Sequence, residues 1–163
     1  MNNVPRYSRI AAALLFTFAA AATTVAPASA ATVRAPAAYT HQTAPTQFID
    51  IKGTKIAYRR FGKPSAVPLV FFQHFTGTMD NWDPMVTDGF ARDREVILFD
   101  NAGVAGSGGT VPESVEGMAQ VAIDLLSALG LKQVDLLGFS LGGLVAQEVT
   151  FERPDLVDRK SVV

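Results

Sequence analysis

The chain has 163 residues, of which 48% are hydrophobic, and a formal net charge of −1 at pH 7. These values suit one packed domain and give no support for a nucleic-acid partner, which selects basic surfaces. The absence of cysteine excludes disulfides and thiolate metal sites. The two histidines, His41 and His74, do not have a zinc-binding spacing. We therefore expect no metal and no cofactor.

The first 30 residues have the pattern of a secretory signal peptide. Arg6 and Arg9 precede an uncharged apolar stretch at 10–22, and Ala28-Ser29-Ala30 forms a small-residue cleavage pattern. The apolar stretch is shorter than the roughly 20 residues that span a bilayer. An uncleaved membrane anchor is the main competing interpretation. We expect cleavage after Ala30, export to the periplasm or the extracellular space, and no stable membrane insertion.

The next stretch, 31–46, is rich in Ala, Pro and Thr. It is predicted to be a flexible linker between the signal peptide (1–30) and a folded domain (47–163). His41 lies within it and is interpreted as a solvated linker residue rather than a ligand. The domain then begins with two short apolar segments, 48–51 and 56–58, on either side of a turn, and this pattern predicts an antiparallel hairpin.

Three nearly continuous apolar runs follow the hairpin, at 69–73, 96–100 and 134–137. Such runs are typical of strands buried on both faces of a sheet. Residues 159–163 are expected to begin a further strand.

Helical patterns separate these strands. Apolar residues of 114–129 recur at three- and four-residue intervals, 141–152 continues in the same way, and 85–90 predicts a short helix or turn. Strands that alternate with helices indicate parallel pairing, because parallel strands need crossover connections. The predicted fold class is α/β, a mostly parallel central sheet flanked by helices, with an N-terminal antiparallel hairpin.

The most informative motif is the pentapeptide Gly138-Phe139-Ser140-Leu141-Gly142, which has the form G-x-S-x-G. It lies where a predicted strand ends and a predicted helix begins. A tight turn at this point raises the serine to its apex and directs the helix N-terminus toward it. The glycines are needed because the turn leaves no room for Cβ atoms. We interpret Ser140 as a catalytic nucleophile; the alternative is an ordinary Ser-Gly turn.

Several separated motifs together resemble the N-terminal half of the α/β-hydrolase superfamily, in particular its esterase-like and haloperoxidase-like members. The loop 73–77 (Gln-His-Phe-Thr-Gly) corresponds to the family's H-G-x oxyanion loop, although His74 occupies a position where glycine is usual. Residues 100–107 correspond to its D-x-R-G-x-G-x-S loop. The resemblance implies that the backbone N–H groups of Phe75 and Leu141 form an oxyanion hole. It also implies that the strand at 69–73 lies between those at 96–100 and 134–137.

The resemblance further implies a triad in the order serine, acid, histidine, but the 21 residues after Gly142 contain no histidine. We therefore expect a fragment that lacks both the triad acid and the base. His74 stays open as a replacement base, although a hydrogen bond that shapes its own loop is the favoured interpretation. Asp100 is expected to cap its own loop rather than act as the triad acid, and Trp82 to anchor a surface turn.

The function predicted from these patterns is an exported serine hydrolase that acts on small-molecule, ester-type acyl substrates. One alternative is a catalytically inactive, truncated or binding protein on a hydrolase scaffold, because a fold does not dictate function. Another is a haloperoxidase-like enzyme, which the sequence does not separate from an esterase. The substrate and the oligomeric state stay open.

Overall fold

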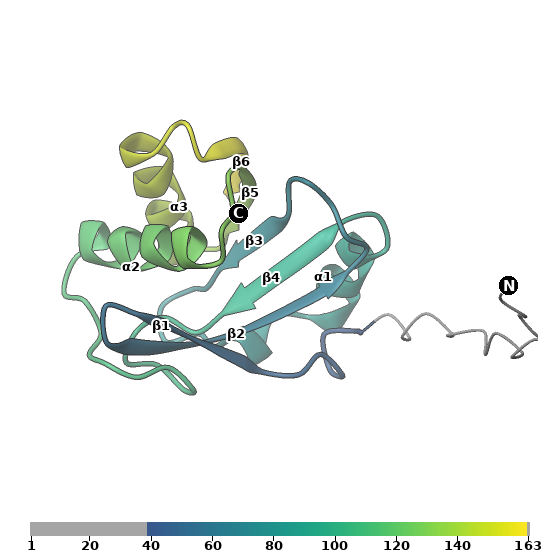
Figure 1. Cartoon of the computed structure of the whole chain (residues 1–163), viewed down its shortest axis with the longest axis horizontal. Coiled ribbons are helices and arrows are strands. Elements are labelled where there is room, and N and C mark those ends of the chain that lie inside the picture. Colours follow the sequence, from purple (N-terminus) through teal and green to yellow (C-terminus); the bar gives the residue numbers. More distant parts are fainter. Residues whose placement is uncertain (1–38, 163) are drawn as a thin grey trace, which may run out of the picture. The chain divides into compact units, whose positions relative to one another are not determined.

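The computed structural model describes residues 39–162 (Figure 1). The predicted signal peptide, its cleavage site and the first half of the predicted linker lie outside these residues. Six strands form one sheet in the order β1-β2-β4-β3-β5-β6. In chain order the strands are β1 Gln47–Ile51, β2 Thr54–Gly62, β3 Leu69–Phe72, β4 Glu95–Phe99, β5 Val134–Gly138 and β6 Val157–Val162.

The sheet changes from antiparallel to parallel pairing along its width. β1 pairs with β2, and β2 with β4, in antiparallel fashion, whereas β3 runs parallel to both β4 and β5, and β5 runs parallel to β6. The predicted fold class, the hairpin and the position of β3 between β4 and β5 are all confirmed. β6 begins two residues earlier than expected, at Val157.

Helices cover both faces of the sheet. On one face, α2 (Val115–Ala128) and α3 (Leu141–Glu152) pack on a core that includes Val70, Phe72 and Leu136. On the other face, α1 (Pro84–Ala91) contributes to a smaller core around Phe71 and Leu98. Alternate residues of β3 therefore serve opposite cores, which is why this strand reads as a continuous apolar run.

The helix boundaries follow from local capping. Ser114 precedes α2 and its hydroxyl accepts a hydrogen bond from the Gly117 N–H, while the Asp83 carboxylate caps α1 by accepting from the Met85 N–H. A short 3-10 helix, η1 (Met79–Asn81), starts at Thr78 with a complete capping box. Within the described residues, no helix is both long and apolar enough to cross a membrane.

The prediction for His41 is wrong. Its side chain is 3% exposed, and its Nδ1 lies 2.9 Å from the Thr87 hydroxyl of α1. Its backbone N–H donates to the Asp88 carboxylate at 2.7 Å, and its ring packs against Phe61. A composition rich in Ala, Pro and Thr indicated a linker, but these contacts with residues 20 to 47 positions away hold the turn against the domain.

Candidate active site

The turn between β5 and α3 places Ser140 in a strained and accessible position. All five residues of β5 are buried, and the chain then reverses into α3. Ser140 has φ of 54° and ψ of −120°, and its side chain is exposed. This positive φ fits the tight turn expected from the pentapeptide. A non-glycine residue in this region carries strain that surrounding contacts must sustain, and such residues concentrate at functional sites.

Backbone crowding explains the two glycines that flank Ser140. A Cβ on Gly138 would lie 2.6 Å from the Cα of Gly143, and a Cβ on Gly142 would lie 2.5 Å from the carbonyl oxygen of Gln73 and overlap that of Phe72. These atoms belong to the backbone and are unable to rotate away. Gly142 therefore lets α3 start directly against the end of β3.

The N-terminus of α3 presents the Leu141 N–H beside the serine. Leu141 is the first residue of α3, so its N–H has no partner within the helix. The N–H groups of Gly142 and Gly143 bond back to the carbonyls of Phe139 and Ser140 at 3.0 and 2.9 Å. The turn is thus closed around Ser140, and the Leu141 N–H is available to an incoming oxygen.

The predicted oxyanion loop lies next to this turn. β3 pairs directly with β5, with Phe72 opposite Gly138, and the Phe139 N–H donates to the Phe72 carbonyl at 3.1 Å. The loop itself forms a turn in which the Gly77 N–H donates to the His74 carbonyl at 3.0 Å. Thr76 has φ of 62°, and Phe75 is 71% exposed. Both loops of the candidate site therefore contain one non-glycine residue with positive φ.

His74 shapes its own loop, as the favoured interpretation expected. Its Nδ1 lies 2.7 Å from the Phe75 carbonyl oxygen, and because that oxygen only accepts, Nδ1 carries the proton. The ring packs edge-on against Phe139, with centroids 5.7 Å apart. Among the described residues, it forms no hydrogen bond with Ser140 or with a carboxylate. The structure therefore gives the replacement-base alternative no hydrogen-bonded relay.

Asp100 caps its own loop as predicted, and it also does something the sequence did not indicate. Its side chain is 2% exposed, and Oδ2 accepts from the Gly106 N–H at 3.1 Å. Oδ1 accepts from the Met79 N–H of η1 at 2.8 Å, which joins the loop after β4 to the segment after the oxyanion loop. Both oxygens bond to backbone groups, so Asp100 is not engaged as a triad acid here.

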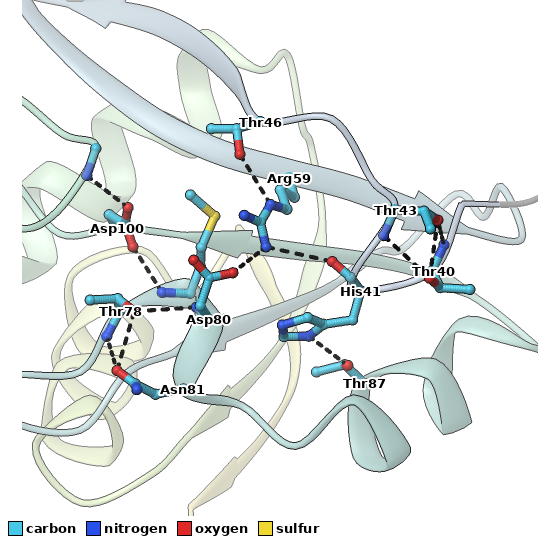
Figure 2. A network of polar contacts seen from close by, with 12 residues as sticks. Thr40, His41, Thr43, Thr46, Arg59, Thr78, Asp80, Asn81, Thr87 and Asp100 are labelled. Atoms are coloured by element: carbon cyan, nitrogen blue, oxygen red, sulfur yellow. Dashed lines mark hydrogen bonds and ion pairs between the residues drawn. The ribbon is translucent and has the colours of Figure 1, made fainter.

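A polar network beside η1 was missed by sequence reasoning (Figure 2). The Arg59 guanidinium of β2 pairs with Asp80 of η1, and it also donates to the Thr46 hydroxyl at 3.1 Å and the His41 carbonyl at 3.5 Å. Burial lowers the pKa of His41, and the adjacent Arg59 lowers that pKa further. Arg59 therefore connects the turn at 40–44 to the helix that follows the oxyanion loop.

Aromatic residues fill the space behind the two loops. Trp82 anchors its turn, as predicted, by packing edge-on against Phe71 with ring centroids 4.9 Å apart, and it reaches Phe139 at 6.4 Å. The buried Trp82 Nε1 makes no hydrogen bond within the described residues, and neither does either polar atom of the Gln73 side chain. Phe71, Trp82 and Phe139 thus form an apolar cluster next to the two loops.

Comparison with known proteins identifies relatives for this arrangement. A family model described as alpha/beta hydrolase fold matches residues 67–159. The chain is 26% identical over 99 residues to "Putative carbamate hydrolase RutD" of Rhizobium rhizogenes, covering 60% of this chain and 37% of that protein. It is 33% identical over 97 residues to a poly(3-hydroxyalkanoate) depolymerase of Ectopseudomonas oleovorans, covering 59% and 34%.

A solved structure agrees with these matches. An alpha/beta hydrolase fold protein from Chitinophaga pinensis superposes with a TM-score of 0.75 at 48% identity, covering 77% of this chain and 46% of that one. The chain therefore spans less than half the length of each of these proteins.

Proposed function

We propose that this chain, which belongs to the alpha/beta hydrolase fold family, carries the nucleophile and the oxyanion hole of an exported serine hydrolase that acts on ester-type acyl substrates. The observation that carries the proposal is Ser140, which combines an exposed side chain, a φ of 54° and a position directly before α3. An ordinary Ser-Gly turn does not require this conformation.

The proposed chemistry starts with attack by the Ser140 hydroxyl oxygen on the substrate carbonyl carbon. The carbonyl electrons move to the oxygen, and in this proposal the N–H groups of Phe75 and Leu141 stabilise the negative charge. Each such donor is worth about 3–4 kcal/mol of transition-state stabilisation. Collapse of the intermediate releases the alcohol and leaves an acyl-serine, and water then attacks the acyl carbon, giving the carboxylic acid and restoring the hydroxyl.

The serine proton needs an acceptor, and neither histidine of the chain is placed to take it. His41 is bonded to Thr87 on α1, and His74 is bonded to the Phe75 carbonyl. We therefore propose that the base and the acid come from outside the 163 residues described by this sequence. The names of the two curated relatives, a carbamate hydrolase and a polyester depolymerase, both refer to substrates with an acyl carbonyl, which supports this reaction class.

Selective phosphonylation tests the assignment of Ser140, since a fluorophosphonate forms a bond from its phosphorus to the serine oxygen and releases fluoride. The purified chain is incubated with a fluorophosphonate, and the modified residue is located by peptide mass mapping. Ser140 should react at least about a hundredfold faster than the exposed Ser127 of α2, because only Ser140 has oxyanion donors beside it. Ser140→Ala should remove the adduct, while the matched variant Ser127→Ala should keep it. Equal reactivity of the two serines would contradict the proposal.

The pH dependence of the same reaction tests for a missing base. Without a base, the rate should rise about tenfold per pH unit between pH 6 and 9, because only the small alkoxide fraction reacts. Hydrolysis of p-nitrophenyl acetate should be correspondingly slow. A rate that levels off near neutral pH, or rapid turnover abolished by Ser140→Ala, would reveal a base within this chain, and His74→Ala would be the next variant to measure.

The proposal of export has its own test. N-terminal sequencing of material secreted by the host should begin at Ala31. An intact Met1 in a membrane fraction would favour the anchor interpretation instead.

A further inference from the structure

Asp100 is a buried carboxylate that the proposed chemistry does not use. It follows β4 directly, at the edge of the sheet where Ser140 also lies, and it is 2% exposed. Burial of a charge is unfavourable unless hydrogen bonds replace the lost water. Among the described residues, Asp100 takes part in no ion pair, and its charge is met by the backbone N–H groups of Met79 and Gly106.

The surroundings fix the position of this carboxylate. The Asp100 N–H donates to the Ala57 carbonyl of β2 at 3.0 Å, and its carbonyl accepts from the Ser107 hydroxyl at 2.8 Å. The Ser107 hydroxyl in turn accepts from the Ala57 N–H at 2.9 Å. Because the backbone on both sides is held in this way, the side chain has little freedom to follow a moving loop. It acts as a fixed anchor rather than a mobile cap.

The anchored group, the Met79 N–H, lies two residues after the oxyanion loop at 73–77. Met79 lies four positions after Phe75, and it opens η1, whose Thr78 and Asn81 form a capping box. At its other end, the loop is held by the pairing of Phe72 with Gly138. Figure 2 shows Asp100 reaching to the segment beside Thr78 from the strand behind it. The loop is thus fixed at both ends.

Strain within the loop makes these end points necessary. Thr76 has φ of 62°, and a β-branched residue adopts this region only when its surroundings impose it. The Met79 side chain is 3% exposed within the smaller core, so its packing and its backbone bond to Asp100 together hold this end of the loop. The Gly77 N–H bond to the His74 carbonyl orients the peptide unit that carries the Phe75 N–H, and the bond from Met79 to Asp100 holds the end of the turn that makes this bond.

We propose that Asp100 is a positioning residue for the oxyanion hole, acting through Met79 to hold the Phe75 N–H toward the reacting carbonyl oxygen. This inference rests on the proposed function, since it assigns the role of a residue at the same site. A carboxylate suits the task because it accepts with both oxygens. An asparagine would accept with one atom and turn an N–H donor toward the other backbone N–H.

The test compares Asp100→Asn with Asp135→Asn. Asp135 is also a buried aspartate of the sheet, 5% exposed, but its partner is Arg94 at 2.7 Å and it lies near the start of β5. Residue-resolved amide hydrogen exchange should show faster exchange at Phe75 to Met79 in Asp100→Asn, with β5 amides unchanged. Asp135→Asn should alter exchange at 75–79 no more than it alters exchange in the rest of the sheet.

Saturation kinetics of fluorophosphonate labelling provide the second readout. Asp100→Asn should lower the maximal rate of Ser140 modification about tenfold while the half-saturating probe concentration stays the same, because binding surfaces are untouched. A purely structural role would not separate these two quantities. Asp135→Asn should leave both unchanged.

Each outcome is decisive. Faster loop exchange with an unchanged labelling rate would overturn the inference, since the loop would then not stabilise the oxyanion. Loop exchange that rises while the unmodified chain fails to label Ser140 selectively would overturn the proposed function, although the anchoring of the loop would stand. If Asp100→Asn does not fold, Met79→Pro removes the donor instead, because proline is tolerated at the first position of a helix. Failure of both to fold, with Asp135→Asn intact, would assign Asp100 to stability alone.

Discussion

The two loops that meet at Ser140 reach their shapes by different means. The turn at 138–142 is fixed by contacts between backbone atoms, in which Gly142 leaves no space between α3 and the end of β3. The loop at 73–78 is fixed by side chains, with Asp100 holding Met79 and His74 holding the Phe75 carbonyl. The first arrangement needs particular side chains only at five consecutive residues, because its distant partner is the backbone of β3, whereas the second needs a particular side chain 21 positions from Met79.

The difference implies that the two loops have different tolerances to mutation. A backbone clash has no low-energy escape, because relief requires a strand or a helix to move. Removal of one supporting side chain loses only the hydrogen bonds of that side chain, and the remaining contacts still hold the loop. We therefore expect a single substitution in the turn at 138–142 to destabilise the fold strongly. Single substitutions around the loop at 73–78 should each cause a smaller loss of stability.

The largest effect should come from Gly142→Ala. The new Cβ would overlap the Phe72 carbonyl oxygen and lie 2.5 Å from that of Gln73, so the free energy of unfolding should fall by at least about 4 kcal/mol. Gly89→Ala in α1 is the matched control, because its Cβ would have no neighbour within 4 Å, and it should stabilise the chain by about 0.5–1 kcal/mol. Urea unfolding followed by circular dichroism measures both; similar values for the two variants would contradict the comparison.

A smaller loss is expected from Gly77→Ala in the other loop. Here the Cβ would lie 2.9 Å from Nε2 of His74, an atom at the end of a side chain that can turn aside. The cost should be about 1–2 kcal/mol. The double variant Gly77→Ala with His74→Ala should be less destabilised than the two single changes predict together, as a double-mutant cycle would measure. Strict additivity would show that the ring is not the obstacle.

Arg59→Met should have a still weaker effect, about 1 kcal/mol, because its partner Asp80 is largely exposed. The change should appear locally, as faster amide exchange at Asp80 and Asn81. Arg60→Met is the control, since the neighbouring Arg60 loses a comparable pair with Glu95 at 2.7 Å but has no bond to η1. Equal exchange at Asp80 in both variants would argue against Arg59 as a support for this segment.

The smallest expected effect is the acid sensitivity contributed by His41. Burial lowers the pKa of His41 below 6.5 in the folded chain, and Arg59 lowers it further, while the carboxylates of Asp80 and Asp88 act in the opposite direction and limit the shift. The unfolded chain then binds a proton on His41 more readily than the folded chain does. The free energy of unfolding is therefore undiminished by His41 above pH 6.5, and it declines as the pH falls below that value. Thermal unfolding between pH 5 and 8 should show the decline, and a His41→Gln variant should not.

The sequence was sufficient for features determined by neighbouring residues. The apolar runs located β3, β4 and β5, and the pentapeptide around Ser140 located the tight turn before α3, because a strand, a turn and a helix are consecutive in the chain. The order of the strands came from resemblance to a family. Local patterns alone do not specify which strand lies in the middle of a sheet.

The features that were missed all depend on distant partners. His41 was read as solvated because its neighbours in sequence are small and polar, yet Thr87 and Phe61 enclose it. The bond from Met79 to Asp100 and the contacts of Arg59 likewise join separate strands and loops. Of these features, only Asp100 was indicated by the sequence, because it directly follows a buried strand. That position predicted a bond to its own loop at 100–107 and not the bond to Met79 after the oxyanion loop.

The contact of Gly142 with β3 has a consequence for how such a protein can diversify. Because this contact joins main-chain atoms, it does not depend on the identity of the surrounding side chains. Exposed rim positions such as Phe75 and Phe139 can therefore exchange their side chains without displacing the attacking oxygen. A randomised library at these two positions should retain a high fraction of folded members, whereas one at Gly138 and Gly142 should retain few. Substrate preference is in this sense free to evolve around a nucleophile that stays in place.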